Sequence, residues 1–238
     1  MPDVAYLEEL FATKRRLDIE TNATPDGARL LAELKAWQST RLARTYEDLR
    51  RDPRCTAAVE FFLSDLYGPQ SFTRRDADFE RAWDRLKRGL PDRALEALGH
   101  ALELQVLSTQ LDQAMVGRLA GAALNALSYA SAYRAVGRAA ARQRQIDLIV
   151  SIGNDLARLV EFPLIGLALR AAHVPAHLAG FGALQDFLER GFSAFRPLRD
   201  ARVLLEAIRT RETALMQALF NGSDDPFHLE TQQEQEPP

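Results

Sequence analysis

Three residues of this chain have types and a spacing that could bind a metal ion. Glu96, His100 and Glu103 are separated by four and three positions, so a helix would place all three on one side. Metal sites in helical bundles combine Glu with Glu-x-x-His pairs on facing helices, whereas the order here is Glu-x3-His-x2-Glu. Two interpretations stay open: a metal site, and a histidine that is hydrogen-bonded in the core or at its rim.

A pair of histidines further along the chain also has the spacing of metal ligands. His173 and His177 are four residues apart, as two ligands on one face of a helix are. Pro175 lies between them, and we expect it to end the helix near His173, because proline removes a backbone donor and clashes with the preceding turn. The sequence therefore predicts a disturbed geometry for this pair, and no bound cofactor is expected.

The most distinctive stretch runs from Cys55 to Phe79 and joins an apolar helix through Gly68-Pro69 to a dense group of charges. On a helical wheel Asp65 falls inside the apolar arc, where a carboxylate needs a partner because burying an unpaired charge is costly. Reversal of the chain at the break could bring Arg74 or Arg75 to it. We favour a structural ion pair over a ligand site here. The candidate cluster consists of Asp65, Tyr67, Arg74, Arg75 and Asp76.

A second cluster of charges lies on the last two long helices that the sequence predicts. Its members adjoin apolar stripes, so they could join the two helices through ion pairs. Structural ion-pair networks also produce such patterns, and we interpret the cluster as structural. It consists of Glu189, Arg190, Arg211 and Glu212.

Apolar residues recur at three- and four-residue intervals along most of the chain, and no alternating strand pattern is sustained. The sequence therefore predicts an all-α, single-domain bundle of about eight or nine helices. Residues 92–116 carry apolar side chains on two opposite sides, so we expect a central helix there. Gly191 lies in an apolar face, where its missing side chain would let another helix cross closely. Further predicted helices cover residues 3–18, 28–51, 75–90, 139–160, 163–173, 181–195 and 197–220.

The composition is that of an ordinary globular protein, with 47% hydrophobic and 26% charged residues among 238. We expect residues 1–222 to form one all-helical domain. Residues 223–238 are polar and end in prolines, which predicts a disordered tail. Cys55 is the only cysteine, which excludes an internal disulfide and a cysteine-based zinc site.

Charge and hydropathy also predict the setting of the protein. The net charge of −3 gives no overall attraction for nucleic acid or anionic membranes. The first residues lack the basic start of a signal peptide, and no apolar run approaches the length of a membrane span. We expect a cytoplasmic protein whose partner is an unidentified protein or small molecule, without membrane or nucleic acid. The sequence is compatible with a homo-oligomer as well as with a monomer.

Four segments of the chain resemble a known family. They are TYxDL from Thr45, FFLxDLYGP from Phe61, the pair Arg75-Asp76, and FLERGF from Phe187. They look like an uncharacterised family of bacterial, mostly proteobacterial, all-helical proteins, a domain of unknown function. The resemblance covers nearly the whole chain. It implies a helical fold and a bacterial cytoplasmic setting, and it implies no activity.

We interpret the chain as a non-enzymatic binding or protein-interaction module. A phosphate-cradling loop and a Gly-x-Ser-x-Gly elbow are absent from the sequence, and apolar helical surface is plentiful. The alternative is a metal- or cofactor-dependent oxidoreductase that uses the histidines and glutamates named first. Nucleic-acid binding through arginine doublets such as Arg74-Arg75 has the least support, because the net charge is negative.

Overall fold

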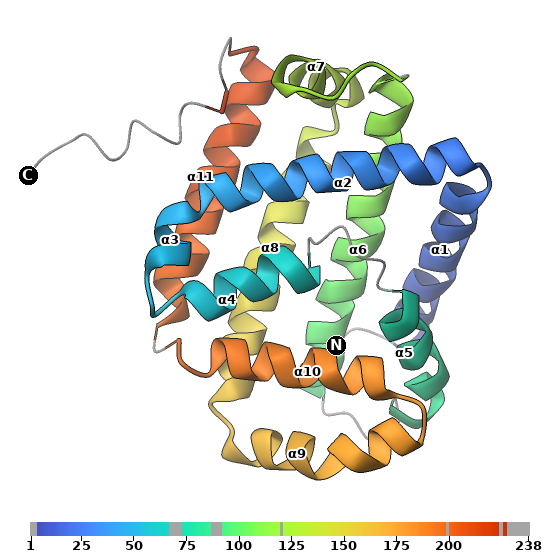
Figure 1. Cartoon of the computed structure of the whole chain (residues 1–238), viewed down its shortest axis with the longest axis vertical. Coiled ribbons are helices and arrows are strands. Elements are labelled where there is room, and N and C mark those ends of the chain that lie inside the picture. The colour runs from blue at the N-terminus through green and yellow to red at the C-terminus, as the bar shows by residue number, and fades with distance from the viewer. Residues whose placement is uncertain are drawn as a thin grey trace, which may run out of the picture.

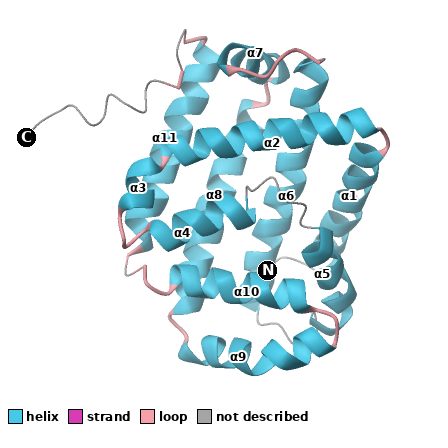
Figure 2. Cartoon of the chain, viewed as in Figure 1, coloured by secondary structure: helices cyan, strands magenta, loops and turns pink. Residues whose placement is uncertain are grey.

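The computed structural model describes residues 4–66, 73–86, 92–119, 121–198, 200–223 and 226–227. Within these ranges every regular element is a helix (Figure 2), which confirms the predicted all-α class. None of the helices described there combines the length and the apolarity that crossing a membrane requires. The elements are α1 (Val4–Asn22), α2 (Pro25–Thr45), α3 (Glu47–Arg51), α4 (Thr56–Phe61), a π-helical turn η1 (Phe62–Leu66), α5 (Thr73–Leu86), α6 (Asp92–Leu119), α7 (Ala126–Val136), α8 (Ala139–Val160), α9 (Pro163–Leu178), α10 (Gly182–Phe195) and α11 (Ala201–Asn221).

These described ranges contain eleven α-helices, so the predicted number is too low. One cause lies at Tyr46, inside the predicted helix 28–51. Its backbone leaves the helical region, with φ −111° and ψ 22°, and separates α2 from α3. The Tyr46 ring is buried and its hydroxyl donates to Glu212 at 2.9 Å. A tertiary contact thus overrides the local helical pattern at this point.

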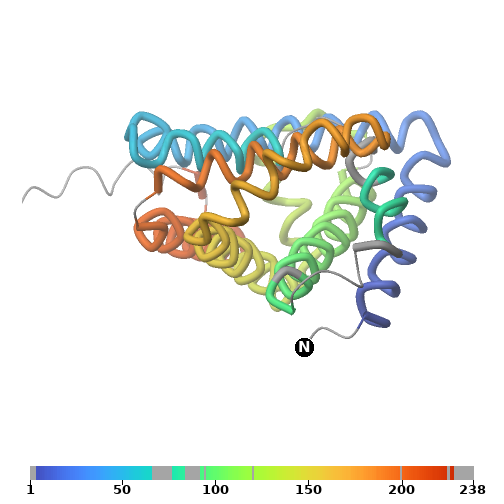
Figure 3. The backbone as a smooth tube through the Cα atoms, turned by 90° about the horizontal axis from the view of Figure 1, so that it is seen from below, coloured from blue at the N-terminus to red at the C-terminus, as the bar shows by residue number. Residues whose placement is uncertain are grey.

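The helices form two layers and a side wall (Figure 1). α6, α8 and α11 lie side by side, with α8 in contact with both neighbours. The view from below shows α2, α3, α4 and α10 crossing over them in a second layer, while α1 and α5 close one side (Figure 3). α9 packs against α10 at one end of the molecule.

α6 contributes to each of the three hydrophobic clusters that the described residues form. Leu102 belongs to the cluster with α1 and α5, and Leu104 to the cluster with α4, α8 and α10. Met115 belongs to the cluster with α2, α7 and α11. α6 is therefore packed on more than one side, as the two apolar stripes of residues 92–116 predict.

α9 continues through Pro175 to Leu178, so the prediction that this helix ends near His173 is wrong. Pro175 lies in the last turn, where its missing N–H removes only one hydrogen bond of the helix. The carbonyl of Pro175 still accepts from the N–H of Ala179 at 3.0 Å. Packing of α9 along α10 holds the helical backbone in place at this position.

Part of the segment after α11 returns to the bundle. Pro226 is buried, and the Phe227 ring centre lies 5.5 Å from that of Trp37 and 6.0 Å from that of Tyr129. These two residues fall within the segment 223–238 that the sequence predicts as a disordered tail. Phe227 packs on α2 and α7, and residues 228–238 of the predicted tail lie outside the described residues.

Gly191 lies against another helix, as the sequence predicts. A Cβ atom at this position would come within 3.0 Å of the Phe61 ring on α4. We expect Gly191→Leu to lower the free energy of unfolding by about 1–3 kcal/mol, because added carbons overpack a filled site. Gly117→Leu on α6 is the matched control, since a Cβ atom there meets nothing within 4 Å. Chemical denaturation measures both variants, and equal stability would contradict close packing at Gly191.

Candidate functional site

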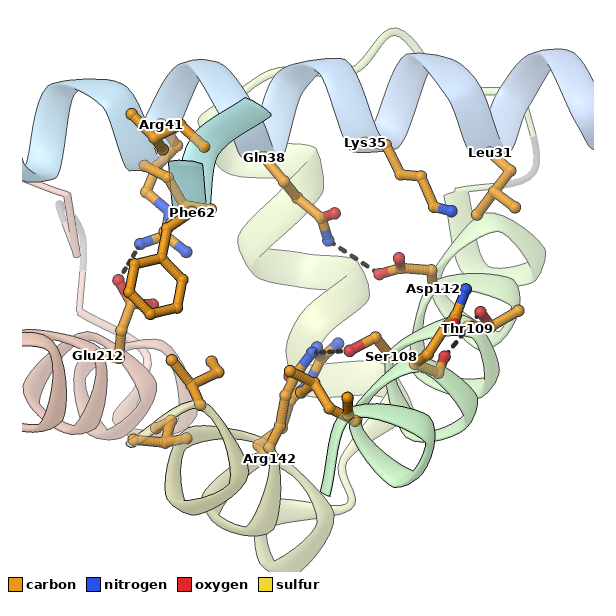
Figure 4. A pocket seen from close by; sticks show the side chains of 18 of the residues that line it. Leu31, Lys35, Gln38, Arg41, Phe62, Ser108, Thr109, Asp112, Arg142 and Glu212 are labelled. Atoms are coloured by element: carbon orange, nitrogen blue, oxygen red, sulfur yellow. Dashed lines mark hydrogen bonds and ion pairs between the residues drawn. The ribbon is translucent and has the colours of Figure 1, made fainter. Parts of the chain in front are cut away.

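A cavity of about 670 Å³ lies between the two layers of helices. α2 borders it on one side and α6, α8 and α11 on the other (Figure 4). Its volume is in the range of sites for small organic ligands. The exposed lining residues Arg15, Ile19 and Asn22 belong to α1, so the cavity reaches the surface beside this helix. Apolar lining residues include Leu42, Phe62, Leu104, Ile149, Leu204 and Ile208.

Arg142 of α8 points into this cavity and is only 4% exposed (Figure 4). Its neighbours are weak partners: Nη2 lies 3.1 Å from the Met115 sulfur, and Nη1 lies 3.3 Å from Gln145 Oε1. The guanidinium carbon lies 4.4 Å from the centre of the Tyr133 ring. Among the described residues, Nε has no hydrogen-bond partner and the guanidinium has no ion-pair partner. Because arginine keeps its charge, a full positive charge faces the cavity.

Asp112 of α6 and Gln38 of α2 face the same part of the cavity. Gln38 Nε2 donates to Asp112 Oδ1 at 3.0 Å. Burial raises the pKa of the Asp112 carboxyl, and the hydrogen bond from Gln38 opposes this shift. The charges of Arg142 and Lys35 also act to lower it. Figure 4 shows Lys35 directed from α2 toward Asp112. We call the side chains of Lys35, Gln38, Asp112 and Arg142 the polar end of the cavity.

A second buried arginine in the cavity wall is neutralised within the fold. Arg41 Nη1 donates to Glu212 Oε1 at 2.5 Å, and each side chain is 13% exposed. The Tyr46 hydroxyl donates to the same oxygen at 2.9 Å. Burial acts to lower the pKa of Arg41, but the Glu212 carboxylate outweighs burial and raises it. The pair joins α2 to α11.

Arg142 and Asp112 are not among the candidate residues predicted from the sequence, although both follow a pattern that the sequence shows. Arg142 precedes Ile146 by four residues, so it falls on the buried face of α8. Asp112 precedes Met115 by three residues, and Met115 is fully buried in an apolar stripe of α6. A charge aligned with an apolar stripe, the criterion that identified Asp65, would have identified both residues.

An ion pair between Asp65 and Arg190 joins the two charge clusters predicted from the sequence. Asp65 of η1 accepts hydrogen bonds from Arg190 Nε at 2.9 Å and from Nη2 at 2.7 Å, which ties η1 to α10. Outside the described residues lie Tyr67 and the side chains of Arg74, Arg75 and Asp76. The predicted contact of Asp65 with Arg74 or Arg75 therefore also lies outside the described residues.

The other members of the second cluster have described partners on further helices. Arg211 donates to the Asp48 carboxylate of α3 at 2.7 and 2.6 Å, and these bonds lower the pKa of Asp48. Glu189 Oε1 lies 3.0 Å from Nδ1 of His173 on α9. Glu212 binds Arg41 of α2, as described above. These contacts fasten α10 and α11 to neighbouring helices.

Two of the three candidate metal ligands of α6 take part in separate ion pairs. His100 Nδ1 lies 2.9 Å from Asp155 Oδ2. Glu103 accepts from Arg144 at 2.7 and 2.8 Å, and Glu96 is exposed. In the part of the chain that the structure describes, none of the three belongs to a group of metal-capable side chains within ligating distance.

The histidine pair of α9 has a different setting. Because α9 continues through Pro175, His173 and His177 keep helical spacing, and their ring centres lie 4.4 Å apart. Asp186 of α10 joins them in a group of three side chains that could hold a metal ion. The structure thus brings together a pair whose geometry the sequence predicts to be disturbed.

Comparison with known proteins places this fold in a family. The family model described as Domain of unknown function (DUF8198) matches residues 18–226. No curated protein and no solved structure matches the chain. The matched residues begin within α1 and end beyond α11, so they include the polar end of the cavity. The chain belongs to the family of the domain of unknown function DUF8198.

Proposed function

We propose that the protein binds a singly charged organic anion with a hydrocarbon body inside the cavity. The observation that carries this proposal is the guanidinium of Arg142, which is buried, faces the cavity and has no ion-pair partner among the described residues. An unpaired buried charge is strongly unfavourable. A ligand carboxylate against Arg142 would remove that penalty.

The charges of the lining favour a ligand with one negative charge. Two basic lining residues are already neutralised in ion pairs, one of them Arg41 with Glu212. At the polar end, Arg142 and Lys35 face the single carboxylate of Asp112. This leaves an excess of one positive charge at the polar end, and the two other charged lining residues, Arg15 and Glu80, have opposite signs. The planar guanidinium fork suits a carboxylate, because the two groups can form two parallel hydrogen bonds.

The apolar walls favour a hydrocarbon body on the same ligand. Phe62, Ile149 and Ile208 are among the apolar lining residues. Each methylene group moved from water to such a surface contributes about 0.8 kcal/mol. A straight-chain or branched carboxylate of moderate length would therefore satisfy both parts of the cavity.

The proposal is for binding without a chemical step, in the bacterial cytoplasmic setting that the family resemblance implies. The side chains of the polar end can orient a ligand through hydrogen bonds and charge. A metal-dependent oxidoreductase centred on α6 has less support, because His100 is bound to Asp155 and Glu103 to Arg144.

Isothermal titration with straight-chain carboxylates from hexanoate to hexadecanoate, and with the corresponding alcohols, tests the proposal. We expect the wild type to bind at least one carboxylate. Arg142→Met should weaken that binding by about tenfold or more, which corresponds to about 1.4 kcal/mol. Affinity for the alcohol of equal length should change little, because the alcohol has no charge for Arg142 to pair.

Arg144→Met is the matched control for this experiment. Arg144 lies on the same helix, its side chain is 49% exposed, and it binds Glu103 outside the cavity lining. This variant should bind carboxylates as the wild type does. Absence of binding for the whole carboxylate series, or equal carboxylate affinity of Arg142→Met and wild type, would contradict the proposal.

A further inference from the structure

Three side chains where α9 meets α10 have the composition of a zinc site. The ligand atoms of His173, His177 and Asp186 all lie within 4.8 Å of one another. Nε2 of His177 lies 3.2 Å from Oδ1 of Asp186. We propose that these three side chains bind a divalent transition-metal ion, with Zn²⁺ as the best match, independently of the cavity.

Hydrogen bonds at Nδ1 leave Nε2 of each histidine available for the metal. His177 Nδ1 lies 2.9 Å from the backbone oxygen of His173, which can only accept, so Nδ1 carries the proton. His173 Nδ1 lies 3.0 Å from Glu189 Oε1. In each neutral ring, Nε2 then holds the lone pair that binds a metal. Metal-bound histidines are typically oriented by such a carbonyl or carboxylate on the second nitrogen.

The supporting groups are themselves held in place. Gln185, which is 5% exposed, donates to Glu189 Oε1 at 2.8 Å and to a backbone carbonyl of α9 at 2.7 Å. Gly182 leaves room for the His177 ring, because a Cβ atom at position 182 would lie 2.8 Å from His177 Cδ2. The histidine rings thus have limited freedom to turn away from the site.

The donor set decides which metal ions fit. Two imidazole nitrogens and one carboxylate oxygen suit Zn²⁺, which in open sites takes three protein ligands and a water molecule. Mg²⁺ and Ca²⁺ prefer sites built of oxygen ligands. His173 and His177 are exposed, so water can complete the coordination.

Competition of the tag-free chain with a chromophoric chelator for Zn²⁺ tests this site. We expect one Zn²⁺ per chain and no comparable binding of Mg²⁺. Glu189→Gln should weaken zinc binding by about 10–100-fold, as loss of a supporting carboxylate typically does. His177→Ala removes a ligand and should weaken it further. Asp186→Ala should act in the same direction.

Two variants separate this site from the other proposals. His100→Ala removes a histidine outside the group, and Arg142→Met alters the cavity. Both should bind Zn²⁺ as the wild type does. A wild type that binds no Zn²⁺, or undiminished binding in both His177→Ala and Asp186→Ala, would overturn the site. Thermal unfolding by circular dichroism checks that each exposed substitution leaves the fold intact.

Discussion

Glu212→Gln is expected to lower the free energy of unfolding by about 3–5 kcal/mol, which is the usual consequence of removing one partner of a buried ion pair. The substitution keeps the size of the side chain but leaves the Arg41 guanidinium without its carboxylate at 2.5 Å. Arginine cannot lose its charge to compensate. The Tyr46 hydroxyl also loses an ionised acceptor. Urea denaturation of wild type and variant measures the difference.

Two further variants test the cause of this loss. Glu206→Gln changes an exposed glutamate on the same helix and should alter stability by less than about 0.5 kcal/mol. Replacing Arg41 and Glu212 together by methionine should recover much of the loss, because no unpaired charge remains. A Glu212→Gln protein as stable as wild type would show that the Arg41 pair does not hold α2 to α11.

Arg142→Met is expected to raise the free energy of unfolding, by about 1–4 kcal/mol, while it weakens carboxylate binding. The substitution removes a buried charge whose described hydrogen-bond and ring contacts are those with Met115, Gln145 and the Tyr133 ring. Methionine is flexible enough to fill the vacated space. A binding residue that is unfavourable for folding is typical of functional sites. Denaturant titration in the absence of ligand measures the effect.

Arg144→Met again provides the comparison. It removes a partly exposed ion pair with Glu103, so it should change stability by about 1 kcal/mol at most and in the destabilising direction. Marked destabilisation by Arg142→Met would instead indicate that Arg142 serves the packing of α8 and not a ligand.

Apolar periodicity predicts the longer helices well, because their buried faces are local in sequence. The predicted range 139–160 coincides with α8, and residues 92–116 fall within α6. The predictions fail where tertiary contacts decide. The Tyr46 contact with Glu212 divides one predicted helix, and packing on α10 carries α9 through Pro175.

The candidate site is less predictable than the fold, because its parts are distant in sequence. Gln38, which donates to Asp112 at the polar end of the cavity, lies 74 residues from it along the chain. The cavity depends on how the layer with α2 spans α6, α8 and α11, and helical periodicity does not specify that arrangement. Only the alignment of Arg142 and Asp112 with apolar stripes is visible in advance.

The most direct test of the proposed ligand is an NMR titration of decanoate labelled with carbon-13 at its carboxyl group. In complex with the wild type, the bound carboxyl should titrate at a lower pKa than free decanoate, because the Arg142 guanidinium stabilises the ionised form. In Arg142→Met this lowering should disappear. A bound carboxyl with the same pKa in both proteins, or no bound signal in the wild type, would contradict the assignment of Arg142 as the anion-binding residue.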